Sequence, residues 1–439
     1  MAQEIYFKGA SIEEEPKLLF DNADTSAVNK EPYYGLKAYG PFDKQCTTLK
    51  IGIIAPKSSV DAVKRFVAVL QSGDSKFFSG GMQQFFRTKL NISHVVESAG
   101  IKIKDYEEAG KSFVAKAKRG DTDVVLCFIP LTSNIYINTP YYRLKAILSL
   151  HDLPSQMLTQ KTIDNPTFTY LNVASAIFAK SGFIPWALGA EMPNTDIIIG
   201  ISVSDRICDE NRIIKNRYVG YVNVFDQYGK WMFFEGVAEA YNKEDIPNKI
   251  VMLVKRAVER YKNEKGVFPE KVHIHYWKRF SRKEKESVNN MLKELNANVR
   301  IAYTSINSDH PYRFYDLESL DGSLMRGYYA YFNDDILLST TGTSTEFRKS
   351  PYRMGTPKLL HLKTEQYPET FISKDELVHQ VLALTKLNWA TSSLIIREPI
   401  TLTFSQALAN LTSAITETEW QEIQKISVNP NMRNKPWFI

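Results

Sequence analysis

Apolar residues along the chain switch between two spacings, and the switching predicts a mixed α/β protein. Leu49 to Ala55 is a continuous apolar run typical of a buried strand, and Val60 to Leu70 carries apolar residues at helical spacing. Asp123 to Ile129 is a second buried-strand candidate, followed by a loop and a helix from about Tyr141 to Leu150. This strand, helix, strand order predicts a parallel sheet, so the first domain is expected to be Rossmann-like.

A second series of strands begins after a proline-bounded break near Pro185 to Pro193. Asp196 to Val203 predicts its first strand. The remaining expected elements are a hairpin with arms at 218–225 and 231–237, strands at 271–277 and 299–306, and helices at 246–261, 282–295, 375–387 and 404–415. Strand hairpins first and alternating strands and helices afterwards are typical of an RNase H-like sheet.

The chain of 439 residues is long enough for two domains. We expect a polar extension with little periodicity over residues 1–45, a first domain over 46–187 and a second over 188–439. The acidic and aromatic extension either docks a partner protein or packs on the first domain, and the sequence leaves both alternatives open.

The composition excludes several protein classes. No run of about 18 apolar residues could cross a bilayer, and residues 1–30 do not resemble a signal peptide, so we expect a cytoplasmic protein. Cys46, Cys127 and Cys208 are odd in number and far apart, which argues against a disulfide framework and favours buried thiols. A net charge of +6 raises the expectation of a polyanionic partner without deciding it.

Tyr141 and Lys145 are a candidate pair for binding the terminal phosphate of a strand. They are four residues apart and would share one helix face, where a ring can stack a base while the ammonium holds its phosphate. The alternative is an ordinary solvated helix face. A doubly charged phosphate needs several such convergent donors to leave water.

The segments that contain these residues resemble a known domain. Tyr141 to Lys145, Pro154 to Gln156 and Ala179 to Trp186 resemble the guide-anchoring MID domain of Argonaute proteins. The resemblance implies that residues 46–187 are a MID domain. It also implies that Tyr141, Lys145, Gln156 and Lys180 bind the 5′-phosphate of a guide strand.

The apolar tail Lys435 to Ile439 resembles the tail of short, two-domain prokaryotic and archaeal Argonautes. In that family the last carboxylate helps to bind a divalent cation at the guide phosphate, so the resemblance implies a magnesium ion held by Gln156 and Ile439. The alternative is that the aromatic tail simply covers a core.

Residues 196–415 resemble the PIWI domain of the same family. The segments that carry this resemblance are Gly200 to Val203, Met325 to Gly327, Leu384 to Trp389 and Glu398 to Leu402. Together the matches imply a short Argonaute with an RNase H-like PIWI domain over 188–439 and no room for the N and PAZ domains of long Argonautes.

The acidic ligands that slicing Argonautes use are missing, so we expect no cutting. Ser202 stands where the first aspartate of the family falls, and a neutral hydroxyl cannot replace a bridging carboxylate. Trp277 lies near the second aspartate position, and the neighbouring Lys278 and Arg279 repel cations. The fourth ligand position survives only if His361 occupies it.

Several basic residues are candidates for contacts with a nucleic-acid backbone. They are Arg279, Arg282, Arg326, Arg348 and Arg353. By resemblance, the partners are a guide RNA or DNA, a complementary target DNA or RNA, and a separately encoded effector in prokaryotic defence.

Two rival hypotheses remain. In the first, the fold is the same but the protein is an active guide-directed nuclease, acting through His361 with nearby acids. In the second, it is a metabolic α/β enzyme whose Argonaute-like motifs are coincidental. His273 and His275 alternate onto one strand face, but without a third ligand they are expected to be structural.

Overall fold

The computed structural model describes most of the chain. The described residues are 7–439 except 75, 133–138, 207–216, 238–240, 320–321, 342–357, 394–395, 414–420, 423–431 and 433. Among the helices it describes, none combines the length and the apolar character that crossing a bilayer requires.

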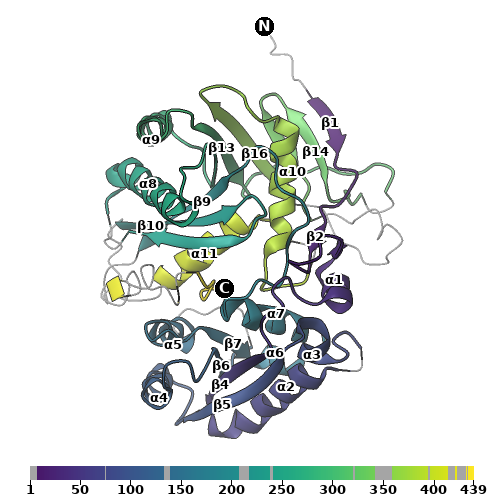
Figure 1. The fold of residues 1–439 in the computed structure, drawn as a ribbon, viewed down its shortest axis with the longest axis vertical. Helices are drawn as coiled ribbons and strands as arrows, with labels where there is room; N and C mark the ends of the chain where they lie inside the picture. The colour runs from purple at the N-terminus through teal and green to yellow at the C-terminus, as the bar shows by residue number, and fades with distance from the viewer. Residues whose placement is uncertain are drawn as a thin grey trace.

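The lower lobe in Figure 1 is built on a four-stranded sheet in the order β5-β4-β6-β7, with every neighbouring pair parallel. Its strands are β4 (Thr48–Pro56), β5 (Lys89–Ser98), β6 (Val124–Ile129) and β7 (Ser155–Thr159). All six residues of β6 are buried, as expected for a strand covered on both faces. This arrangement confirms the predicted parallel α/β sheet.

Helices cover both faces of this sheet. They are α2 (Val60–Ser72), α3 (Gly81–Phe86), α4 (Ile103–Lys116), α5 (Pro140–Ser149), α6 (Gln160–Asp164) and α7 (Tyr170–Lys180). Ile51 and Ile53 of β4 belong to the same core as α2 and α7, whereas Ile54 packs into a second core with α4 and α5. Because successive side chains of β4 point to opposite faces of the sheet, they pack against two separate layers of helices.

The upper lobe contains a nine-stranded mixed sheet in the order β1-β14-β15-β16-β13-β12-β9-β10-β11. Its strands are β1 (Phe7–Ser11), β9 (Ile197–Arg206), β10 (Arg217–Asp226), β11 (Trp231–Gly236), β12 (Lys271–Tyr276), β13 (Arg300–Asn307), β14 (Tyr328–Phe332), β15 (Asp335–Leu338) and β16 (Leu360–Tyr367). Only β9, β12 and β13 pair in parallel, and the remaining neighbours are antiparallel.

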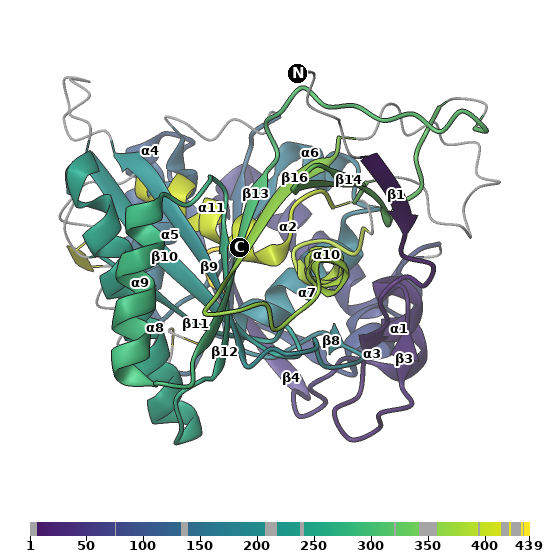
Figure 2. The same cartoon turned by 90° about the horizontal axis from the view of Figure 1, so that it is seen from above.

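Two pairs of helices cover opposite faces of the large sheet, as the view from above shows (Figure 2). They are α8 (Ile246–Lys265) with α9 (Arg282–Leu295), and α10 (Lys374–Leu384) with α11 (Ile400–Ser413). Ile199 and Ile201 pack with α8, whereas Ile198 packs with α11. On β16, Leu360 and Leu362 pack with α10.

The N-terminal segment, predicted as a polar extension with little periodicity, contains regular secondary structure. It forms β1, β2 (Leu18–Leu19), β3 (Val28–Asn29) and α1 (Pro32–Tyr39), and it contacts both lobes. β1 pairs with β14, while α1 packs on α3, where the rings of Tyr33 and Phe85 lie 5.5 Å apart. The segment therefore packs on the first domain, which was one of the two alternatives, and also on the second.

One buried carboxylate joins this segment to the large sheet's domain. Glu15 lies 2.8 Å from the Arg326 guanidinium and 3.2 Å from Lys386 Nζ. Burial raises the pKa of Glu15, but the charges of Arg326 and Lys386 outweigh that effect and hold it below its ordinary value. Lys386 also donates to the carbonyl oxygens of Pro16 and Lys30.

Candidate functional site

Tyr141 and Lys145 share one face of α5, as their spacing predicted. Pro140 opens the helix, and the side chain of Thr139 caps it by accepting a hydrogen bond from the Tyr141 amide at 3.4 Å. Four residues later, Lys145 Nζ lies 5.7 Å from the centre of the Tyr141 ring. Because α5 begins at Pro140, Tyr141 and Lys145 lie one turn apart on the same face of the helix.

That ammonium points at the end of the chain. Lys145 is only 2% exposed, and its Nζ donates to the Phe438 carbonyl at 2.7 Å and to an oxygen of Ile439 at 3.1 Å. Figure 1 shows the chain end at the junction of the two lobes, next to α7. The structure thus brings Lys145 and Ile439 together from the two lobes.

Lys180 and Gln156 form the second half of the cluster. Lys180 is the last residue of α7 and is 1% exposed, and its Nζ donates to Gln156 Oε1 at 2.6 Å. Gln156 lies in β7, and its amide Nε2 donates to the Met157 carbonyl at 3.1 Å. The bond to Lys180 therefore uses the oxygen of the Gln156 amide and fixes its orientation.

The cluster holds two buried lysine side chains close together. Burial lowers the pKa of Lys145 to about 7, and burial together with the charge of Lys145 lowers the pKa of Lys180 well below its usual range. Among the described residues, no aspartate or glutamate forms an ion pair with either lysine. A buried pair of lysines with no aspartate or glutamate partner is suited to an anionic ligand of high charge, which would favour the charged form of both side chains.

The aromatic tail is docked, as its composition predicted. Trp437 is fully buried and Phe438 is 4% exposed. The Phe438 ring packs against Trp231 and Phe234 of β11, with centroid distances of 5.9 and 6.1 Å, and against Phe404 of α11 at 5.5 Å. The second lobe therefore holds the backbone oxygens that Lys145 contacts.

The oxygens predicted to bind a metal ion are already hydrogen-bonded. Gln156 Oε1 accepts from Lys180, and an oxygen of Ile439 accepts from Lys145. Both are oxygen donors of the kind that Mg²⁺ takes. With two ammonium groups beside them, these oxygens fit a divalent cation only together with a bound anion that offsets its charge.

Two of the predicted slicer positions lie side by side on the large sheet. Gly200 of β9 pairs with His275 of β12, and Ile201 with Tyr276, so Ser202 and Trp277 are the next residues on these strands. A Cβ on Gly200 would lie 2.3 Å from the Thr401 carbonyl, so glycine is what lets α11 approach this face. Ser202 shares that face because it is two residues further along β9.

His361 lies on the opposite face. Its neighbours Leu360 and Leu362 point at α10, so His361 points away from α10 and α11. His361 Nε2 lies 2.8 Å from Asp335 Oδ2, and Lys363 Nζ lies 3.2 Å from Asp335 Oδ1. His361 and Ser202 therefore lie on opposite faces of the sheet, which disfavours the rival hypothesis of a metal site that includes both.

His273 and His275 are both buried beneath α11 and α10. His273 Nε2 lies 2.8 Å from the Asn194 carbonyl, and His275 Nδ1 lies 3.0 Å from Thr401 Oγ1. Burial lowers the pKa of His273 to about 4 and that of His275 to about 3. Both are neutral near pH 7 and hydrogen-bonded to their surroundings, in agreement with a structural role.

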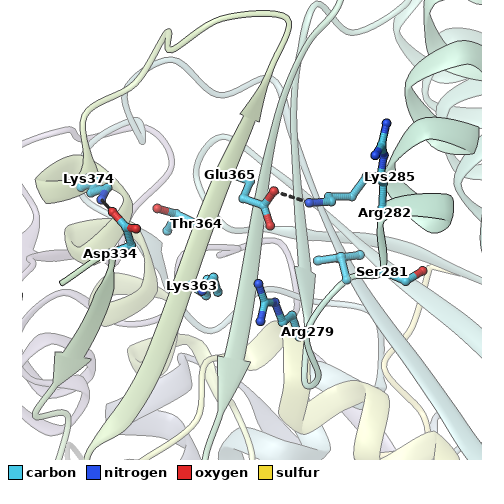
Figure 3. A pocket seen from close by; sticks show the side chains of 10 residues that line it. Arg279, Ser281, Arg282, Lys285, Asp334, Lys363, Thr364, Glu365 and Lys374 are labelled. Atoms are coloured by element: carbon cyan, nitrogen blue, oxygen red, sulfur yellow. Dashed lines mark hydrogen bonds and ion pairs between the residues drawn. The ribbon is translucent and has the colours of Figure 1, made fainter. Parts of the chain in front are cut away.

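The five candidate arginines differ in their surroundings. Arg326 is 6% exposed, and its guanidinium is bonded to Glu15, the carbonyls of Thr340 and Leu382, and Thr385 Oγ1. It therefore does not offer its charge to a nucleic acid in this structure. Arg279 and Arg282 are exposed and line a cavity on the α9 side of the sheet (Figure 3). Arg348 and Arg353 lie outside the described residues.

Comparison with known protein families identifies the family of this two-lobed chain. The profile of the Piwi domain matches residues 124–417, about two thirds of the chain. The chain belongs to the Piwi family. The match begins in β6, so it includes the lysine cluster as well as most of the large sheet.

Argonautes are among the proteins that this Piwi chain resembles. The Argonaute of Aquifex aeolicus strain VF5 is 23% identical over 346 residues, which cover 75% of this chain and 45% of that protein. A structure of Clostridium butyricum Argonaute bound to a guide DNA and a 19-mer target DNA matches with a TM-score of 0.74 at 18% identity, covering 94% of this chain and 53% of that one. A crystal structure of A. aeolicus Argonaute matches with a TM-score of 0.60 at 19% identity, covering 92% and 53%.

The Piwi chain thus spans about half the length of these relatives. The comparisons confirm the predicted resemblance to Argonautes and the α/β fold with its RNase H-like PIWI domain.

Two contacts could not be predicted from the residue types. Lys145 bonds to the backbone carbonyl of Phe438, which every residue type has. Asp335 contacts His361 from the neighbouring strand, 26 positions away in the sequence.

Proposed function

We propose that this Piwi chain binds the 5′-phosphate of a guide strand between its two lobes and uses the guide to recognise a complementary nucleic acid without cutting it. The proposal takes the C. butyricum relative, which holds a guide and a target strand, as its starting point. The rest of it depends on the residues of this chain.

The observation that carries the proposal is the buried pair Lys145 and Lys180. Lys145 Nζ already contacts backbone oxygens of Phe438 and Ile439, and Lys180 Nζ contacts Gln156, but neither lysine pairs with an aspartate or glutamate among the described residues. A terminal phosphate carries nearly two negative charges near neutral pH, whereas an internal phosphodiester carries one. The site is therefore expected to prefer the end of a strand, with the Tyr141 ring positioned to stack on the first base.

Replacement of each lysine by methionine tests this assignment. Lys145→Met and Lys180→Met keep most of the side-chain volume but remove the charge, so each should reduce the preference for a 5′-phosphorylated guide over a 5′-hydroxyl guide by about ten-fold or more. The matched control is Lys111→Met, an exposed lysine on α4, which should leave the preference unchanged. Unchanged preference in both buried-site variants would refute the assignment.

A magnesium ion is part of the proposal. Gln156 Oε1 and Ile439 would hold it, and the bound phosphate would supply further oxygens and offset its charge. When bound, the ion would add positive charge beside the phosphate. Chelation of divalent cations should therefore weaken binding of the phosphorylated guide more than that of the hydroxyl guide.

The residues at the slicer positions support the absence of cutting. A two-metal phosphodiester hydrolase needs carboxylates that bridge its ions, and this chain offers the Ser202 hydroxyl and the Trp277 ring instead. Lys278 lies beside them, 3.7 Å from Glu284. His361 faces the other side of the sheet and is bonded to Asp335, so it is poorly placed to compensate.

The chemistry of the strands and the partner are the finer parts of the proposal. From the family resemblance, we propose a guide RNA, a target DNA and a separately encoded effector that responds to target binding in prokaryotic defence. Sequencing the nucleic acid that co-purifies with the chain from its native cells tests the first two. A population of DNA guides, as in the C. butyricum relative, would change the strand assignment and leave the phosphate site intact.

A further inference from the structure

Strand β1 forms one edge of the nine-stranded sheet, and its backbone is open on that side. It is the first strand in the order of the sheet and pairs with β14 (Figure 1). Within the described part of the chain, no other strand or loop bonds to the backbone of residues 8–11. An exposed strand edge of this kind is a template for pairing with another polypeptide.

The register of β1 with β14 shows which backbone groups point outward. Ser11 lies opposite Tyr328, so Ile12 lies opposite Gly327, and the Ile12 amide donates to the Gly327 carbonyl at 3.0 Å. Bonded and non-bonded positions alternate in an antiparallel pair, so the residues of β1 that bond to β14 are the even-numbered ones. The N–H and C=O groups of Gly9 and Ser11 therefore point away from β14, toward the open edge.

Two features that protect strand edges in other proteins are absent from β1. It contains no proline, and its register with β14 runs over all five residues without a bulge. Its side chains at Gly9, Ala10 and Ser11 are small, and a Cβ added to Gly9 would meet no atom within 4 Å. A second strand therefore has room to approach this edge.

An apolar loop adjoins the open edge. Residues 308–327 lead from β13 into β14, and the loop lies on β14 because Phe314 packs against the same small core as Tyr328. Two apolar side chains of this loop are largely exposed, Tyr315 at 58% and Leu317 at 96%. Exposed apolar side chains beside an unpaired strand edge are typical of a surface that binds another protein.

The edge and the loop carry more exposed acids than bases. Within residues 8–14 and 308–319, the exposed carboxylates are Glu13, Glu14, Asp309 and Glu318, and the exposed cations are Lys8 and Arg313. Glu13, Glu14 and Glu318 form no ion pair with any described residue. This negative charge repels a nucleic-acid backbone and favours a basic polypeptide.

We propose that β1 receives an extended basic segment of a partner polypeptide, which adds to the nine-stranded sheet as a further strand. Main-chain bonds to Gly9 and Ser11 would hold the segment, and its apolar side chains would rest on Tyr315 and Leu317. A second copy of this chain would bring the same acids to the contact, so charge favours a different polypeptide. The inference locates the contact of the proposed partner protein and in that respect rests on the proposed function. It does not depend on guide binding, because no residue of the lysine cluster takes part.

A short peptide of alternating lysine and valine residues is the probe for this edge. One control peptide has every second amide methylated, which removes the N–H groups that pair with a strand, and another has glutamate in place of lysine. Affinity for the full chain is measured at low salt, where exposed charges are least screened. The unmodified peptide should bind at least about ten-fold more tightly than either control.

Substitution of Gly9 tests the main-chain contact. Gly9→Pro removes an N–H that points away from β14, so it should preserve the β1–β14 pairing and lower the affinity for the lysine–valine peptide by about ten-fold. Gly9→Val is the matched control, because it keeps the N–H, suits a strand and has room for its side chain. It should bind the peptide like the wild type.

A charge variant provides a second test that does not depend on how well Gly9→Pro folds. Glu13→Gln with Glu14→Gln removes two exposed charges beside β1 and should weaken binding of the peptide by about three-fold at low salt. Glu97→Gln with Glu108→Gln, at two exposed glutamates of the other lobe, should leave the affinity unchanged.

Three outcomes would overturn the inference. The first is a wild-type chain that does not bind the lysine–valine peptide, and the second is equal binding of the methylated peptide or by Gly9→Pro. The third is a dimer of the wild-type chain that Gly9→Pro abolishes, which would assign the edge to a second copy. The preference for a phosphorylated guide is measured in the same variants and should stay at the wild-type value, so a failure of the guide proposal is seen separately.

Discussion

At the scale of single residues, the central feature is a lysine held in a place that disfavours its charge. Lys145 is buried, and its pKa is lowered to about 7, while in the unfolded chain it keeps its ordinary value near 10.5. Burial thus favours the neutral amine of Lys145 in the free protein, and an anionic ligand would favour its charged form. Binding sites of this kind often reduce stability to gain function.

This predicts a pH dependence of stability in the guide-free protein. Between pH 7 and about 10.5 the unfolded chain binds a proton at Lys145 that the folded chain does not, so the free energy of unfolding rises with pH in that window, at up to about 1.4 kcal/mol per pH unit. Lys145→Met lacks this contribution. Denaturant titrations of both proteins across the window should show a wild-type stability that gains on the variant as pH rises. A constant difference between the two would show that Lys145 titrates normally.

The sequence predicted the residues of the lysine cluster better than it predicted how the slicer positions lie on the large sheet. Tyr141 and Lys145 could be placed on one face because a helix fixes the spacing of residues four apart. Gln156, Lys180 and Ile439 came from the family resemblance, and the structure brings them to the same lysines. The face of His361 could not be predicted, since it depends on how β16 pairs with β13 and β15.

At the scale of elements, the C-terminal tail and the N-terminal segment each join the two lobes. The tail packs Trp437 and Phe438 on the second lobe while its backbone oxygens reach Lys145 of the first. The N-terminal segment adds β1 to the large sheet and packs α1 on the first lobe.

Truncation of the tail's buried ring should affect both stability and guide binding. Trp437→Ala creates a cavity in a fully buried position and should cost about 3–5 kcal/mol of unfolding free energy. It should also reduce the preference for a phosphorylated guide, since the Phe438 and Ile439 oxygens lose their support. Trp277→Ala, at a tryptophan that is 50% exposed, is the matched control and should cost about 1 kcal/mol or less. Equal effects of the two variants on unfolding would contradict the docked tail.

The N-terminal segment gives a second prediction at this scale. Glu15→Ala leaves Arg326 and Lys386 buried without their carboxylate and should destabilise the protein by about 3–5 kcal/mol. Its exposed neighbour Glu14 has no such partners among the described residues, so Glu14→Ala should stay within about 0.5 kcal/mol of the wild type. Thermal unfolding of the two variants measures the difference. Similar melting temperatures would mean that the segment is held by other contacts.

Elements with strong local patterns were predictable, and elements defined by distant pairing were not. The predicted helix 282–295 matches α9, whose start is set by Ser281 and Glu284 in a capping box. Strands β14 and β15 are short, and the partner of β1 around Phe332 lies far away in the sequence. A local pattern carries no information on such pairing, so the sequence predicts no strand in the acidic N-terminal segment.

At the scale of the whole molecule, the lysine cluster lies where the two lobes meet. Lys145 and Lys180 belong to the first lobe, and the Phe438 and Ile439 oxygens belong to the tail that docks on the second. This position predicts that both lobes take part in holding the end of a guide strand.

Retention of the target follows from the proposed loss of the slicer ligands. Loaded with a phosphorylated guide and supplied with Mg²⁺ or Mn²⁺, the chain should keep a complementary target bound and intact, because the family resemblance places Ser202 and Trp277 where a slicer needs carboxylates. Denaturing gels of the end-labelled target measure this. One cut at a defined guide position would identify the chain as an active nuclease of the same fold.

The claim on which all of this depends is that the cluster of Lys145, Lys180 and Gln156 receives a strand end. The most direct measurement compares the dissociation constants of two guides of identical sequence, one with a 5′-phosphate and one with a 5′-hydroxyl, for the wild-type chain near neutral pH. The phosphorylated guide should bind at least about ten-fold more tightly, as two charge-assisted hydrogen bonds require. Equal affinities would contradict the account.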